Sequence, residues 1–185
     1  MRPVAKKATN STPRFAPVGL AFLGTVFLQG FHELEHVVQV LQRFVFHNPK
    51  GAGILGTWLD IEPVHLVYNG SFLLLMILCF WAGQFHKRST RRHPLTFWLM
   101  SFALLFQSYH VIEHVFKIVQ LIDTGMNGTP GILGHHFNLV WLHFTYNTIV
   151  YLPLLLVFYI DGYYRTAIAM VSNFLHRGRP RLRRA

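Results

Sequence analysis

The sequence predicts an all-α integral membrane protein, a four-helix bundle of transmembrane helices made of two tandem two-helix repeats. Three observations support this fold class. The chain has four long apolar segments, its basic residues fall on alternate sides of them, and its two halves align at a fixed offset. A pseudo-twofold axis along the membrane normal would relate two such repeats, because each would enter the membrane from the same side.

The four apolar segments cover residues 18–46, 61–83, 94–122 and 137–160. Each reaches the ~20 residues that a helix needs to cross ~30 Å of hydrocarbon. Only 13% of the residues are charged, whereas soluble domains have about 25%. A soluble bundle would also need a polar stripe on each helix, and residues 72–81 are apolar on every side. The composition therefore argues against a soluble protein.

Basic residues alternate between the segments in the way that sets membrane orientation. Fourteen of the seventeen precede the first segment, separate the second from the third, or follow the fourth, and three lie near the other side: Arg43, Lys50 and Lys117. The positive-inside rule then places both termini in the cytoplasm, in a plasma membrane of the bacterial type. We therefore attribute the net charge of +10 to membrane topology. The expected partner is the lipid bilayer, and no nucleic acid is expected as a partner. The first segment is longer than a signal-peptide core and is interpreted as an uncleaved anchor.

The halves align without a gap when the sequence is shifted by 78 residues. Between positions 29 and 80 the shift gives sixteen identities in fifty-two, including matched His, Glu, Tyr, Asn and Gly. Apolar composition would produce chance matches of Leu and Val but not of these types. The single cysteine, Cys79, excludes an internal disulfide and any multi-cysteine metal site.

This repeat predicts the domain organisation. A basic cytoplasmic segment (1–17) precedes the first unit (18–84, outer loop 46–60), and a basic cytoplasmic linker (85–93) leads to the second unit (94–160, outer loop 123–136). Residues 161–185 are predicted to form an interfacial helix and a basic tail. The small size of the chain is compatible with other membrane subunits as its partners.

The repeat also separates polar residues that recur from those that occur once. On a helix, positions i, i+3 and i+4 share a face, and a rise of 1.5 Å per residue brings the recurrent groups to one layer in the outer half of the bilayer. Ionisable groups at that depth are costly and usually functional. The predicted metal ligands are His32, Glu35, His36, His65, His110, Glu113, His114 and His143, with Tyr68, Asn69, Tyr146 and Asn147 as residues that orient them.

Imidazole and carboxylate donors suit a transition metal, with Fe, Cu, Mn and Zn as candidates. The leading hypothesis is a di-metal or paired mononuclear oxidoreductase that acts on a lipid-soluble substrate. A haem held by two histidines is the alternative cofactor. Alternative functions are electron transfer through that haem, ion or proton transport, and a structural subunit in which these groups only join helices.

Two further interpretations concern residues outside the recurrent set. Residues 32–36 match the zinc-protease pattern His-Glu-x-x-His, which needs Glu33 as general base. Glu33 does not recur, so the repeat disfavours this activity. The non-recurrent residues are instead predicted to form a wet outer rim: Glu33, His47, Asp60 and Glu62. The sequence does not decide whether His135 and His136 are metal ligands or ordinary loop residues.

Overall fold

The computed structural model describes residues 16–56, 60–87 and 94–177. In this part the chain is helical and has no strand. Two long helices form its first half, α1 (Ala16–Val40), continued by the π-helical turn η1 (Leu41–Val45), and α2 (Glu62–Ala82). The short 3₁₀ turn η2 (Phe85–Lys87) precedes α3 (Pro94–Thr124), α4 (Leu139–Ile160) and α5 (Tyr163–Arg177). Most of the predicted basic N-terminal segment (1–17), residues 88–93 of the linker and residues 178–185 of the tail lie outside the described residues.

The helix ends follow local sequence signals. Pro63 lies in the first turn of α2 and Pro94 begins α3, positions where the missing N–H of proline has no helical partner to lose. The side chain of Asn138 caps α4 by accepting from the N–H groups of Val140 and Trp141 at 3.0 and 3.4 Å. Gly125, with φ of +69°, terminates α3.

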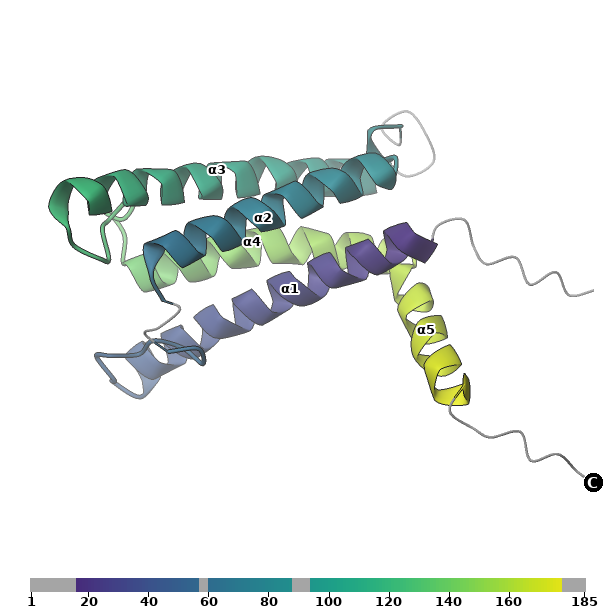
Figure 1. Cartoon of the computed structure of the whole chain (residues 1–185), viewed down its shortest axis with the longest axis horizontal. Coiled ribbons are helices and arrows are strands. Elements are labelled where there is room, and N and C mark those ends of the chain that lie inside the picture. The colour runs from purple at the N-terminus through teal and green to yellow at the C-terminus, as the bar shows by residue number, and fades with distance from the viewer. Residues whose placement is uncertain (1–15, 57–59, 88–93, 178–185) are drawn as a thin grey trace, which may run out of the picture.

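The four long helices form a ring in which each packs against two neighbours. Helix α1 contacts α2 and α4, and α3 contacts the same two. Figure 1 shows that α1 begins and α4 ends at the same end of the bundle, while the loop residues 46–56 and 125–138 lie at the other. We call these the inner end and the outer end.

Helix α5 leaves the bundle at an angle (Figure 1). It begins with a ring stack between Tyr163 and Phe22 of α1, with centroids 4.7 Å apart, and Thr166 covers Gly19. Its predicted place at the membrane interface stays a prediction.

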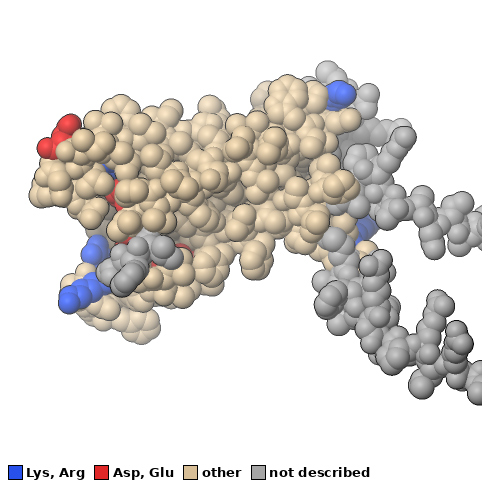
Figure 2. All heavy atoms as spheres, in the orientation of Figure 1, with Lys and Arg blue, Asp and Glu red and all other residues tan. Residues whose placement is uncertain are grey.

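Three of the helices, α2, α3 and α4, are long and apolar enough to cross a membrane. Large apolar side chains on their surfaces are exposed, such as Val67 (69%), Leu105 (74%) and Leu152 (54%). Figure 2 shows an uncharged surface between charged groups at the two ends. Helix α1 is not among the three, and the fourth predicted span stays a prediction.

Packing inside the ring changes along the bundle. The inner half is filled by apolar side chains, among them Phe22, Met76, Met100 and Leu154. Above them lies a layer of paired amides: Gln29 Nε2 donates to Asn147 Oδ1 at 2.8 Å, and Gln107 Nε2 donates to Asn69 Oδ1 at 3.0 Å. The 78-residue shift converts one pair into the other, so the two bonds are related as a twofold axis would relate them.

Candidate metal centre

Six histidines converge inside the outer half of the bundle. Helix α1 supplies His32 and His36, α2 supplies His65, α3 supplies His110 and His114, and α4 supplies His143. Ring centroids lie 5.8 Å apart for His36 and His143, 5.6 Å for His65 and His114, and 5.4 Å for His114 and His143. Five of the six are buried, and the side chain of His65 is 13% exposed. The structure thus brings all the predicted histidines into one cluster.

In α1 and again in α3, two histidines one helical turn apart point their Nε2 atoms at each other. His32 Nε2 and His36 Nε2 are 3.3 Å apart, and His110 Nε2 and His114 Nε2 are 3.1 Å apart. Two imidazoles on a tetrahedral metal, each at ~2.0–2.1 Å, have their nitrogens about 3.3 Å apart. The spacing of each pair is therefore that of two ligands on one ion.

The other ring nitrogen of four histidines is held by an acceptor at the edge of the cluster. His65 Nδ1 donates to the Ile61 carbonyl at 3.1 Å, and His143 Nδ1 donates to the Leu139 carbonyl at 2.8 Å. A carbonyl can only accept, so the neutral form of these rings carries its proton on Nδ1 and leaves Nε2 unprotonated, the form of nitrogen that binds a cation. This outer hydrogen bond is what metal-binding histidines ordinarily make.

For the other two of these four histidines, the acceptor of the Nδ1 hydrogen bond is a side chain. His36 Nδ1 donates to Gln39 Oε1 at 2.8 Å, and His114 Nδ1 donates to Glu62 Oε2 at 3.3 Å. A carboxylate behind an imidazole raises the basicity of the ring and fixes its orientation. His110 Nδ1 is a buried atom without a hydrogen-bond partner.

The second half holds the tightest candidate site. His110, His114 and His143 each offer a ligand atom, and these atoms lie within 4.8 Å of one another. In the part of the chain that the structure describes, no other group of three or more His, Cys, Asp or Glu residues reaches this spacing. Three imidazoles are the protein ligands of catalytic zinc sites, in which water or substrate takes the fourth position.

The carboxylates of the recurrent set lie against the outer loops. Glu35 accepts hydrogen bonds from the N–H groups of Ile54 (2.9 Å) and Leu55 (3.1 Å). Glu113 accepts from Ile132 N–H at 2.8 Å and Leu133 N–H at 3.0 Å. These carboxylates thus hold the repeated Gly-Ile-Leu-Gly segments to α1 and α3. Their role as metal ligands stays a prediction.

The predicted supporting residues occupy equivalent places in the two halves. The Tyr68 ring packs on His32 with centroids 4.5 Å apart, and the Tyr146 ring packs on His110 at 4.9 Å. Asn69 Nδ2 donates to the His65 carbonyl at 3.0 Å, and Asn147 Nδ2 donates to the His143 carbonyl at 2.9 Å. The asparagines therefore link the histidine helices to the glutamine layer below.

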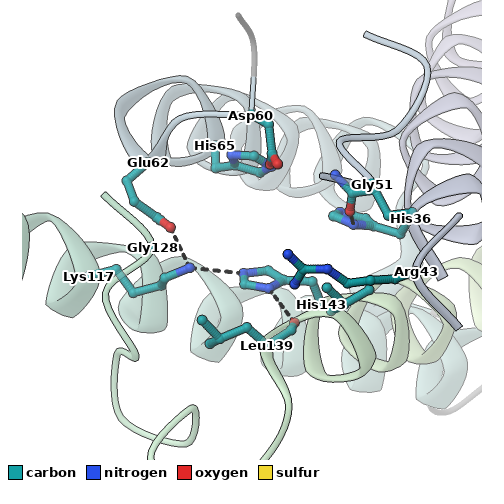
Figure 3. A pocket seen from close by; sticks show the side chains of 12 residues that line it. His36, Arg43, Gly51, Asp60, Glu62, His65, Lys117, Gly128, Leu139 and His143 are labelled. Carbon is teal, nitrogen blue, oxygen red and sulfur yellow. Dashed lines mark hydrogen bonds and ion pairs between the residues drawn. The ribbon is translucent and has the colours of Figure 1, made fainter. Parts of the chain in front are cut away.

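The set of ligands predicted from the repeat does not include two residues that lie in the cluster. Lys117 and Glu62 are buried and form an ion pair of 2.5 Å, and Lys117 Nζ donates to His143 Nε2 at 3.4 Å. Figure 3 shows Lys117 of α3 between Glu62 of α2 and His143 of α4. Neither residue recurs, because their equivalents are Gln39 and Val140, so a filter based on the repeat discards both. A lysine inside an apolar segment was the available signal.

The prediction of a solvent-exposed outer rim is correct for His47 and Asp60 and wrong for Glu33 and Glu62. His47 and Asp60 are exposed, and Asp60 Oδ1 lies 3.7 Å from His65 Nε2. Glu62 is buried by its ion pair. Glu33 is buried because its side chain packs toward α4, where Oε1 accepts from Thr148 Oγ1 at 2.6 Å. His135 and His136 are exposed in the outer loop.

The cluster opens toward the outer end of the bundle. A polar cavity of about 210 Å³ reaches it there, lined among others by His36, His65, His143, Lys117 and Arg43 (Figure 3). This cavity gives water and small polar molecules a route to the imidazoles. No family model, curated protein or solved structure matches this chain.

Proposed function

We propose that the chain is a membrane metalloprotein of four spans and two repeated units, and that its histidine cluster holds one or two transition-metal ions. A single observation carries this proposal: four histidines donate their Nδ1 hydrogens to acceptors at the edge of the cluster, so that the neutral rings keep unprotonated Nε2 atoms. Histidines that served only to join helices would not need their second nitrogens to face one another.

The donor set narrows the choice of metal. Imidazole suits Cu, Zn, Fe and Ni, whereas Mn prefers oxygen ligands. Because the Glu35 and Glu113 carboxylates bind loop amides, the centre is richer in nitrogen than the sequence pattern indicates. An imidazole centre with an open position and a polar access cavity supports an oxidoreductase that uses Cu or Fe.

Haem is less well supported than a bare ion. A haem would have to lie between two of the histidines as a flat macrocycle. Rings from adjacent helices are already close, with His65 and His114 at 5.6 Å and His36 and His143 at 5.8 Å between centroids. The bundle would have to expand to admit the macrocycle.

Transport through the bundle is also less well supported. Below the glutamine layer, the described interior is closed by apolar side chains such as Phe72, Met76, Met100 and Val150. An ion path would need polar groups there. Intramembrane proteolysis would need Glu33 beside the metal, and Glu33 instead bonds Thr148.

Metal analysis of the purified protein, with an absorption spectrum, tests the proposal. We expect near-stoichiometric Cu or Fe and no Soret band. Zinc alone would support the metal centre but overturn the oxidoreductase, because Zn²⁺ has no redox chemistry. His114→Ala should remove most of the metal from a shared centre and about half from two separate centres, and His36→Ala should do the same. His135→Ala, which removes an exposed histidine, is the matched control and should retain the metal. Metal-free wild-type protein, or equal loss in the control, would favour the structural role.

A further inference from the structure

A long apolar groove runs along the outside of the bundle between α1 and α2. It has a volume of about 650 Å³, within the ~300–1,000 Å³ typical of small-molecule sites. Leu28 of α1 and several residues of α2 line it, including Val67, Phe72 and Leu75. Because both helices carry exposed apolar side chains here, the groove faces the hydrocarbon of the proposed membrane.

A second cavity, which reaches the histidines, shares lining residues with this groove. The second cavity has a volume of about 140 Å³ and is lined by His32, His65 and Glu35 among others. Val64 and Tyr68 line both spaces. A molecule in the groove could therefore extend one end past Tyr68 to the imidazoles.

The lining of the path changes at Tyr68. The groove itself is almost wholly apolar, whereas the second cavity combines apolar side chains such as Phe31 and Leu55 with imidazole and carboxylate groups. The Tyr68 hydroxyl donates to the Leu28 carbonyl at 2.7 Å, which fixes the phenol ring between the two spaces and against His32. Water-soluble molecules already have the polar cavity at the outer end, lined by His36 and His143.

We propose that the groove binds a lipid-soluble molecule with a long apolar body and a small, uncharged polar head. The body lies along α2, and the head passes Tyr68 to the side of the histidine cluster formed by His32 and His65. A hydrocarbon alone would leave the imidazole and carboxylate groups of the second cavity unmatched, and a charged head would lose its hydration in the apolar groove. This inference rests on the proposed metal centre and names the substrate class that reaches it.

Two probes test the route independently of each other. A dodecanol derivative with a photoreactive diazirine in its chain should label residues 64–75 of purified protein in detergent, whether or not metal is present. Dodecylimidazole should perturb the spectrum of the metal-loaded protein. Val67→Trp fills the groove from an exposed position, and Leu105→Trp places the same bulk on the exposed face of α3.

We expect Val67→Trp to weaken both probes about tenfold, equivalent to about 1.4 kcal/mol of binding free energy. Leu105→Trp should leave both unchanged, and free imidazole should bind all three proteins equally through the outer cavity. Even labelling of the lipid-facing surface, unaffected by Val67→Trp, would mean that ordinary lipid fills the groove and would overturn the proposal. Metal content distinguishes the two failures: metal-free protein that still shows groove labelling refutes the metal centre but keeps the groove.

Discussion

At the scale of single residues, the two halves share their imidazoles but differ in charge. Gln39 supports His36 in the first half, whereas its equivalent Lys117 pairs with Glu62, which supports His114. The first half thus uses a neutral amide where the second uses a buried ion pair. Removing one member of a buried pair leaves an uncompensated charge, which costs more than removing both.

Glu62→Gln should therefore destabilise the protein by about 3–5 kcal/mol, because Lys117 loses its counter-charge in a buried site. The double variant Glu62→Gln with Lys117→Gln should recover most of this loss, since it installs the amide found at the equivalent position of the first half. Thermal unfolding in detergent measures both effects. Equal loss of stability in the single and double variants would show that charge compensation is not what Glu62 provides.

At the scale of the elements, each outer loop is attached to its helix through a recurrent set of contacts. Gln42 Nε2 donates to the Gly53 carbonyl at 3.2 Å and its Oε1 accepts from Gly53 N–H at 2.9 Å. Gln120 makes the same two bonds with Gly131 at 2.9 and 2.7 Å. With the adjacent Glu35 and Glu113 bonds, these contacts account physically for the recurrence of the Gly-Ile-Leu-Gly segments.

Gly131 has φ of +72°, and a side-chain carbon there would meet Glu113 Oε1 at 2.5 Å. Gly125 has a similar φ of +69° with open space around it, so it is a matched control for backbone strain alone. Both Gly131→Ala and Gly125→Ala should cost about 1–3 kcal/mol from strain. Gly131→Ala should also release the loop, seen as faster hydrogen exchange at the Ile132 and Leu133 amides. Identical exchange in the two variants would mean that the carboxylate does not hold the loop.

At the scale of the whole molecule, the sequence predicted the helices and the convergence of the histidines. Helical spacing places His32, Glu35 and His36 on one broad face. Helical spacing does not predict that the outer loop, and not a neighbouring helix, covers Glu35. This depends on the path of the loop, which the spacing of residues on a helix does not determine. Similarly, Lys117 and Glu62 come from neighbouring helices of different units, and their pairing follows only from the arrangement of the ring.

The same polar residues explain why α1 falls short of a membrane span by composition. Gln29, His32, Glu33, Glu35 and His36 lower its hydropathy, yet all five are buried. Burial inside the bundle lowers their cost in the membrane, because they bond to one another, to α4 and to the outer loop. The exposed face of α1, with Phe27 at 71% and Leu34 at 48%, is as apolar as a lipid-facing helix requires. A fourth span is therefore expected in spite of its composition.

The apolar exposed face of α1 and the distribution of basic residues predict that the outer end of the bundle lies outside the cytoplasm. Asn127→Cys and Gln84→Cys, each made in a Cys79→Ala background, place one exposed thiol at the outer and the inner end respectively. In intact cells, an impermeant maleimide should label the first variant and not the second, and permeabilisation should expose the second. The reverse pattern would invert the topology and place the polar cavity on the cytoplasmic side. Labelling of both sites in intact cells would exclude a bundle that spans the membrane with its two ends on opposite sides.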